Sequence, residues 1–507
     1  MNIAEAKEQI RNAMMAYFTK DEFGNYRIPI EKQRPVLLIG PPGVGKTAIM
    51  EQVASELGVG LVSYSMTHHT RQSALGLPFI KTEQFEDEEY QVSEYTMSEI
   101  IASIYSLMRE TGVREGILFL DEINCVSETL APCMLQFLQY KIFGQHRIPK
   151  GWIVVTAGNP PEYNKSVRDF DIVTWDRLKR IDVEPDYEVW RRYASAKGVH
   201  PAVLTYLSAR KKDFYKVEST VDGKNFVTAR GWDDLSEMIK LYEENDLTVN
   251  EKLVAQYLQD RKIAKDFSIY YDLFNKYKSD YRIDAILDGD PGEDVLFRAQ
   301  RAPIDERLSF LGLLFDAVTG ELRKVCEKED MLDLLAPALR KIRTDSAAAD
   351  APSMPEILDR YIADEAARLE KGRKSSALSP SQQRCIQMMM QELDHYRAAI
   401  LTEGIAADNA HAFERIRQLF GESVGELRSL AARGTKVLDN AFRFCEDAFE
   451  DGDEILIFVT ELTVNYHTAR FIGHYGCDRY YMHNKELQFA ERQAELSRRV
   501  GEFNWEF

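Results

Sequence analysis

The strongest chemical signal in the sequence is a glycine-rich run that ends in a lysine and a hydroxyl residue. It reads Gly40, Pro41, Pro42, Gly43, Val44, Gly45, Lys46 and Thr47, followed by Ala48. Glycines allow a tight turn in which successive N–H groups point into one concavity, and a helix that begins near Lys46 adds its positive dipole end. The run therefore predicts a phosphate-binding loop for ATP, in which Lys46 reaches the β- and γ-phosphates and Thr47 coordinates Mg²⁺. The alternative is a chance glycine-rich turn.

Two adjacent carboxylates, Asp121 and Glu122, follow the apolar run 117–120, about 75 residues after the loop. A buried strand delivers such a pair at its carboxyl end, where ligands sit in open α/β sheets. We expect Asp121 to hold Mg²⁺ through its water shell and Glu122 to polarise the attacking water. Many strands end in acidic turns, so this prediction depends on the spacing from the loop.

Asn159 is a third polar group at a predicted strand end, in the run Gly158-Asn159-Pro160 after residues 153–157. An amide there can hydrogen-bond both the γ-phosphate and the attacking water. The alternative is that Asn159 only shapes an Asn-Pro turn.

Two arginines, Arg177 and Arg180, lie in the run 175–180, which reads WDRLKR. Arginine suits a site where charge develops on phosphate oxygens, and a neighbouring subunit can supply it. We favour Arg177 over Arg180 for this role. The alternative is a surface salt bridge of little energy.

A parallel sheet is needed to bring these groups together. Short apolar runs alternate with helical patterns up to about residue 185, which is typical of strands joined by crossover helices. The predicted strands are 36–39, 60–65, 117–120, 153–157 and 180–183, with helices at 46–57 and 97–110.

Apolar residues recur with a helical period from residue 186 onward, so the rest of the chain is predicted to be almost entirely helical. Residues 455–469 are predicted to form one buried helix, and 345–355 and 371–380 to be linkers. The predicted domains are 1–185, an α/β nucleotide-binding domain; 186–267, a helical lid; 268–344, a helical region; 345–379, linker-like segments with a short helix; and 380–507, a C-terminal helical domain.

The composition of the 507-residue chain is that of a soluble globular protein with several domains, with 45% apolar and 29% charged residues. No apolar run reaches the length of about 18 residues that a membrane-spanning helix needs. Six cysteines without a CxxC pair argue against zinc and disulfides and favour the cytoplasm. The net charge of -18 repels a nucleic acid, so such a partner is not expected.

Together the motifs GPPGVGKT, LFLDEIN, VTAGNP, WDRL and TARGW resemble the AAA+ ATPases, and within them the MoxR-like branch. The resemblance covers about residues 1–265. It implies an α/β P-loop NTPase core with a parallel sheet and a helical lid, here followed by a mostly α-helical C-terminal region. It also implies that Arg177 acts in trans, although MoxR-like proteins usually read LDRF where this chain reads WDRL, and that Arg230 begins a lid helix and touches the γ-phosphate.

Family members form hexameric rings and remodel protein clients, commonly with a von Willebrand factor A domain partner. The resemblance therefore implies a homo-oligomeric ATPase that remodels or assembles a protein. One alternative is a nucleic-acid-directed AAA+ motor or loader, which the acidic charge disfavours. Another is a nucleotide-gated scaffold with little turnover.

Three further groups of residues admit two interpretations each. His68 and His69 could be metal ligands, but adjacent histidines point apart, and a substrate-facing loop is the other reading. The run 143–147 predicts a hairpin that faces a ring channel or simply the surface. His467, His474 and Cys477 invite a metal site, whereas packed helices are far more common.

Overall fold

The structure is a computed structural model that describes residues 1–485, except 69, 86–87, 164–166, 168–169, 171, 221–222, 349 and 451. The chain forms two compact units. The first unit contains Met1–Val189 and Asp359–Met390, and the second contains Trp190–Leu358 and the chain from Gln391 onward.

A five-stranded parallel sheet forms the centre of the first unit, with the strand order β2-β5-β8-β1-β9. All four residues of β1 are buried, as expected for a strand covered on both faces. Each of the five predicted strands is confirmed with its ends within one residue. The strands are β1 (Val36–Ile39), β2 (Gly60–Ser65), β5 (Gly116–Asp121), β8 (Trp152–Gly158) and β9 (Lys179–Asp182).

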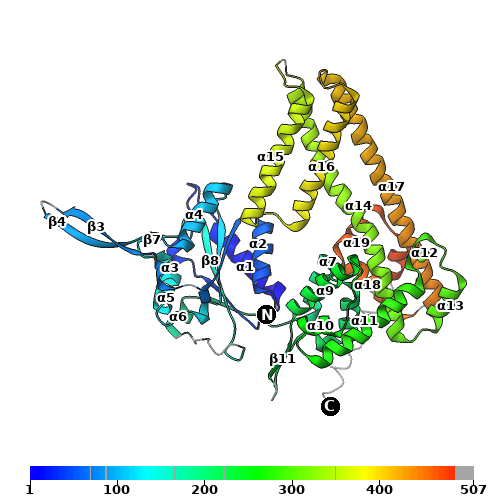
Figure 1. Ribbon diagram of the computed structural model, residues 1–507, viewed down its shortest axis with the longest axis horizontal. Coiled ribbons are helices and arrows are strands. Elements are labelled where there is room, and N and C mark those ends of the chain that lie inside the picture. Colours follow the sequence, from blue (N-terminus) through cyan, green and yellow to red (C-terminus); the bar gives the residue numbers. More distant parts are fainter. Residues whose placement is uncertain are drawn as a thin grey trace, which may run out of the picture. The chain divides into compact units, whose positions relative to one another are not determined.

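Helices cover both faces of this sheet (Figure 1). Along the sheet, the chain crosses from β1 to β2 in one direction and returns through β5 to β8 in the other. Because such crossovers are right-handed, the helices that connect strands in the first direction lie on the opposite face from those that connect strands in the second. Thus α2 (Lys46–Leu57) packs with α1 (Ile3–Phe18) on one face. On the other face, α4 (Glu99–Thr111) and α5 (Ala131–Tyr140) bury an apolar core against the sheet.

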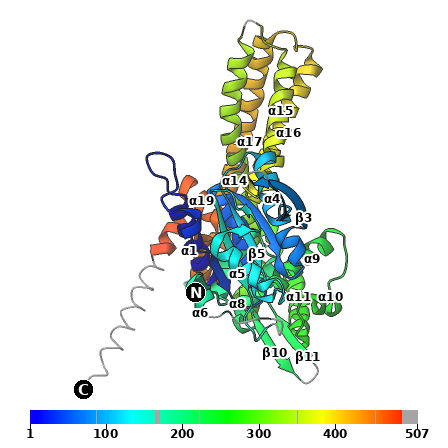
Figure 2. The same ribbon diagram turned by 90° about the vertical axis from the view of Figure 1, so that its left-hand side faces the viewer.

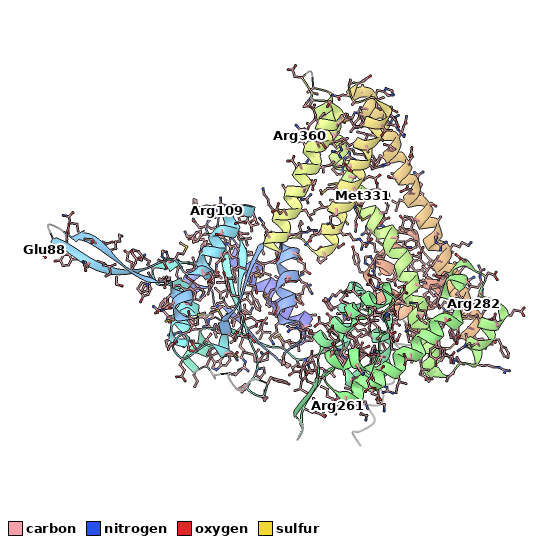
Figure 3. All side chains as sticks on the ribbon, in the orientation of Figure 1. Glu88, Arg109, Arg261, Arg282, Met331 and Arg360 are labelled. Carbon is pink, nitrogen blue, oxygen red and sulfur yellow. The ribbon has the colours of Figure 1, made fainter. Side chains whose placement is uncertain are left out.

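Two antiparallel hairpins extend this unit. The short one, β6 (Ile142–Phe143) with β7 (His146–Arg147), confirms the hairpin predicted at 143–147. The long one, β3 (Pro78–Phe85) with β4 (Glu88–Tyr95), projects as a two-stranded ribbon with Glu88 near its tip (Figures 1 and 3). This ribbon was not predicted, because its strands lie outside the core and lack a regular apolar alternation.

The segment Asp359–Met390 completes the first unit and comes from two long helices, α15 (Met354–Ser375) and α16 (Pro380–Glu403). Lys374 of α15 forms an ion pair with Glu110 of α4, with Nζ and Oε2 3.6 Å apart. The linker prediction for 371–380 is only partly right, because residues 371–375 continue α15 and only 376–379 form a turn. The short helix expected within 345–379 is the 22-residue α15.

The second unit begins within α7 (Tyr187–Lys197), at Trp190. It continues through α8 (Pro201–Ala209), α9 (Ala229–Glu244), α10 (Glu251–Tyr257) and α11 (Arg261–Tyr281). A hairpin of β10 (Lys216–Thr220) and β11 (Gly223–Val227) interrupts the predicted helices and projects from them (Figures 1 and 2). The predicted boundary between residues 267 and 268 falls inside α11, which continues without a break.

A polar network lies in this helical region beside buried aromatic rings. The Glu243 carboxylate oxygen Oε1 lies 3.2 Å from His200 Nε2 and accepts a hydrogen bond of 2.7 Å from the Tyr271 hydroxyl. These hydrogen bonds, led by that of His200, and the nearby charges of His200 and Lys278 lower the pKa of Glu243 to about 2, although burial opposes them.

Long helices build the rest of the second unit. The 43-residue α14 (Ile304–Ser346) runs beside the 41-residue α17 (Asn409–Phe449), as Figures 1 and 2 show. The smaller helices are α12 (Ile283–Asp288), α13 (Glu293–Arg301), α18 (Asp453–Val464) and α19 (Tyr466–Tyr475). None of the helices within the described ranges is long and apolar enough to cross a lipid bilayer.

The prediction of one helix over residues 455–469 is wrong, because Asn465 separates α18 from α19. The Asn465 side chain accepts hydrogen bonds from the backbone N–H groups of His467 and Thr468, 3.0 and 3.3 Å away. An asparagine that caps a new helix in this way ends the previous one.

Candidate active site

The glycine-rich loop joins β1 to α2 at the carboxyl edge of the sheet. Gly45 has a φ of +96° directly before the first residue of α2, a conformation that favours glycine. A Cβ atom on Gly40 would lie 2.7 Å from the carbonyl oxygen of Val183, so the loop also needs glycine where it passes the end of β9. These two positions explain locally why the loop turns tightly.

Lys46, the first residue of α2, is only 8% exposed and points into the loop. Its ammonium nitrogen donates to the carbonyl oxygens of Gly40 at 2.7 Å and Pro41 at 2.9 Å, and to the Asn159 Oδ1 at 2.9 Å. The structure thus brings together Lys46 and Asn159, which are 113 residues apart in the sequence.

Thr47 and Asp121 meet beside Lys46. The Thr47 hydroxyl donates to Asp121 Oδ2 at 3.2 Å, and Asp121 Oδ1 accepts the backbone N–H of Glu122 at 2.9 Å. A hydroxyl and a carboxylate are hard oxygen donors, which Mg²⁺ prefers, and the ion usually keeps several waters. The residues present therefore fit a magnesium ion carried with a triphosphate.

Glu122 adopts a left-handed backbone conformation, with φ +56°, directly after β5. Its carboxylate oxygen Oε2 accepts hydrogen bonds from the hydroxyls of Ser65 at 2.9 Å and Thr67 at 3.1 Å. Ser65 ends β2, so the neighbouring strand holds the carboxylate. Burial and then the negative charges of Glu122 and Asp121 raise the pKa of the Cys125 thiol, which reflects the acidic character of this strand end.

Asn124 positions the backbone at Asn159. Its side-chain amide donates to the Asn159 carbonyl oxygen at 2.8 Å, and Asn124 itself is only 5% exposed. A Cβ atom on Gly158 would lie 2.5 Å from Asn124 Oδ1, so this approach requires glycine there. Asn124, Ser65 and Thr67 were not predicted as site residues. Their placement at a strand end, or within three residues of one, was the available signal.

The two candidate finger arginines lie away from this edge. β9 runs parallel to β1, with Lys179 opposite Val36, so Arg177 and Arg180 lie toward the edge where β1 begins. β1 separates the two edges by about 10 Å. Among the described residues, neither arginine forms a hydrogen bond or ion pair with the loop of its own chain.

These arginines also differ in their surroundings. Arg180 donates through Nε to Asp182 at 2.7 Å, and its guanidinium lies 4.6 Å from the centre of the Trp175 ring. The Arg177 side chain is exposed and forms no hydrogen bond or ion pair with the residues that the structure describes. Arg177 is thus the more available of the two.

Arg230 belongs to the second unit, where it is exposed in the first turn of α9. The expectation that it begins a helix is correct. Thr228 caps this helix by accepting the N–H of Gly231 at 3.2 Å.

The metal-site interpretations outside the loop receive no support from the described part of the chain. His69 and the side chain of His68 lie outside it. No group of three potential ligands occurs within it. His467 is largely buried, which together with the charges of Arg323 and Arg470 lowers its pKa to about 4, and Cys477 lies beyond the end of α19.

Comparison with known proteins identifies the family of the sheet domain. Residues 36–165 match the family model described as ATPase family associated with various cellular activities (AAA). The chain is also 28% identical over 175 residues to the replication factor C large subunit of Pyrobaculum arsenaticum, which covers 32% of this chain and 33% of that protein. The chain thus spans about a third of the length of this relative.

Residues 36–165 therefore form an AAA ATPase domain, which binds and hydrolyses ATP. The predicted parallel-sheet core followed by a mostly helical C-terminal region is confirmed.

Proposed function

We propose that this chain, built on an AAA ATPase domain, is a MoxR-like machine that uses ATP hydrolysis to remodel or assemble a protein partner. The observation that carries the catalytic part is the convergence of Lys46, Thr47, Asp121 and Asn159 at one edge of the sheet. These side chains come from two strand ends and one helix start, and together they suit a triphosphate and its divalent ion.

In this mechanism the loop amides and Lys46 bind the β- and γ-phosphates. Thr47 and Asp121 would hold Mg²⁺, which when bound would supply positive charge to the phosphate oxygens. Glu122 accepts a proton from the attacking water on its carboxylate as the water oxygen bonds to the γ-phosphorus and the bond to the β–γ bridging oxygen breaks. Asn159 orients that water and the γ-phosphate.

The exposed Arg177 supports action on a second copy of the chain. It lies away from its own loop, so it would serve the nucleotide of a neighbour in a homo-oligomeric ring, for which we propose six subunits. Arg180, held by Asp182, is the less favoured candidate. Arg230 would contact the γ-phosphate from the helical lid.

A protein client in the cytoplasm is the favoured partner, and a von Willebrand factor A domain protein is one form that it would take. The net charge of -18 supports a protein over a nucleic acid. The ribbon of β3 and β4 offers contact area, since Phe79, Ile80 and Tyr90 are all more than 40% exposed on it.

A clamp-loader-like, nucleic-acid-directed function is the second candidate. The similarity to a replication factor C large subunit favours it. It predicts DNA-stimulated ATP turnover and DNA binding that weakens steeply with salt.

Steady-state ATP turnover tests the catalytic assignment. Glu122→Gln should lower kcat by 10²- to 10⁴-fold while ATP binding persists, because it removes the base and leaves the phosphate cradle intact. Glu51→Gln, an exposed substitution on α2, is the matched control and should leave kcat unchanged. Equal turnover in Glu122→Gln and the parent would favour a nucleotide-gated scaffold instead.

The same Glu122→Gln variant tests the partner. With ATP it should retain a protein client that ADP releases, in a complex whose mass by light scattering corresponds to a ring. A nucleic acid retained in place of a protein, together with DNA-stimulated turnover of the parent, would favour the loader function.

A further inference from the structure

A cavity lies within the second unit between α7 and α8 on one side and α14 and α18 on the other. The space inside it that can hold the centre of a water-sized sphere is about 80 Å³, and its mouth opens to solvent. Much of the wall is apolar and includes Val199, Leu204, Leu311, Phe315 and Phe458. Ligand sites commonly have this character, with apolar walls and a few polar groups that fix orientation.

Three polar side chains of α14 line this cavity at Asp316, Thr319 and Arg323. Their spacing of three and four residues places them on one face of the helix. Thr319 is 3% exposed, and its hydroxyl has no hydrogen-bond partner among the described residues. The buried Nε of Arg323 likewise has none there.

The two charged members of this face are also unmatched. Within the described ranges, neither Asp316 nor Arg323 forms a hydrogen bond or ion pair through its side chain. The Arg323 guanidinium packs against Gly198, where a Cβ atom would lie 3.2 Å from its Nη2. Asp316 is exposed at the mouth. Burial of its carboxyl against the surrounding protein raises the pKa of that group, and the nearby charges of His200 and Arg323 oppose this rise.

Some other polar groups of the same cavity have partners. Arg191 forms an ion pair with Glu461, and the Asn465 amide donates to the Ser195 carbonyl oxygen at 3.4 Å. The side chains of Asp316, Thr319 and Arg323 have none among the described residues. A buried polar group without a partner is unfavourable, so the Thr319 hydroxyl and the Arg323 Nε suit a ligand that supplies the missing partners.

We propose that this cavity binds a small apolar zwitterion of dipeptide size, with its carboxylate on Arg323 and Thr319 and its ammonium on Asp316. Seven residues of helix separate the two charges by about 10 Å along the axis. Long side chains on a helix tend to lean toward the helix start, which brings an arginine guanidinium closer to a residue seven positions earlier than the backbone spacing. Two extended residues span about 7 Å, so a dipeptide suits two charges that lie closer together than this spacing. The apolar walls take the side chains of the ligand.

Calorimetric titration of the full chain with leucyl-leucine tests the proposal. Leucyl-leucine should bind the parent protein, whereas its N-acetyl and C-terminal amide derivatives should bind at least about 10-fold more weakly, because each lacks one charge. Arg323→Gln should weaken the binding of leucyl-leucine by a similar factor, without further weakening the binding of its C-terminal amide derivative. Asp316→Asn should behave in the same way toward the N-acetyl derivative.

Arg340→Gln, an exposed substitution further along α14, is the matched control and should leave binding unchanged. Figure 3 labels Met331, which lies between the cavity residues and Arg340 on this helix. Unchanged ATP turnover and melting temperature would show that the variants fold. The proposal is overturned if the parent binds no leucyl-leucine at millimolar concentration, if the N-acetyl derivative binds equally well, or if both cavity variants bind leucyl-leucine like the parent.

Discussion

Removing the two hydroxyls that hold Glu122 should raise basal ATP turnover. Ser65 and Thr67 donate to the same carboxylate oxygen at 2.9 and 3.1 Å. Neither bond uses Oε1, but together they hold the carboxylate beside β2 and so oppose a turn of Glu122 toward the attacking water. We therefore expect the Ser65→Ala, Thr67→Val double variant to raise the fraction of molecules in which the Glu122 carboxylate is released from β2.

The size of the effect follows from the hydrogen bonds. Bonds to charged groups contribute about 1.5–3 kcal/mol, but Ser65 is only partly buried and Thr67 is exposed, so water competes for both. About 1 kcal/mol for each bond gives about 2 kcal/mol in total, which corresponds to a shift of about 30-fold between held and released Glu122. This value is the upper limit for the increase in kcat.

Steady-state kcat under saturating ATP is the measurement. Ser63→Ala, an exposed serine two residues earlier on β2, is the control and should not change kcat. In a Glu122→Gln background the double variant should have no effect, because the group that it releases is absent. A double variant with kcat equal to or below that of the parent would refute the reasoning and show that the hydroxyls hold Glu122 in its working position.

Three other predictions concern binding and stability. Lys46→Ala should abolish ATP binding in calorimetry, because the buried ammonium is the only side-chain cation that the loop run contains; retained affinity would contradict the assignment. Gly40→Ala should lower the free energy of unfolding by about 1–3 kcal/mol, since its Cβ would press on the Val183 carbonyl, whereas Gly421→Ala, at an open position in α17, should raise it by about 0.5–1 kcal/mol. The pKa of Glu243 falls from 4.5 to about 2 on folding, so the charged carboxylate stabilises the folded protein above pH 4.5, and this contribution is lost as the pH falls toward 2. In urea titrations, Glu243→Gln should therefore reduce the loss of unfolding free energy between pH 4.5 and 2.

The central strands β1, β5 and β8 were predictable because each contains a short, mostly apolar run between turn signals, as Val36–Ile39 shows. The site followed from them. Parallel strands place their carboxyl ends at one edge, so Asp121 and Asn159 had to lie near the loop that follows β1. In this part of the chain, local pattern and topology agree.

The contacts of single hydroxyl and amide groups could not be predicted in the same way. Ser65 and Asn124 are common residue types, and their roles depend on which strand lies beside which, information that a local pattern does not contain. The break between two helices at Asn465 was also not predictable from the local apolar pattern. The apolar spacing continues across it, while its side chain caps the next helix and ends the first.

Lys46 links phosphate binding to Asn159 through a simple count of donors. An ammonium has three N–H groups, and the hydrogen bonds to Gly40, Pro41 and Asn159 occupy three acceptors at 2.7–2.9 Å. A phosphate oxygen must therefore displace at least one of them. The two carbonyls belong to the loop backbone, whereas the Asn159 amide can rotate about its side-chain bonds, and Asn124 holds the Asn159 backbone in place meanwhile. Occupation of the phosphate site would then turn the Asn159 amide without moving its strand, which is the motion that a residue sensing the γ-phosphate and orienting water requires.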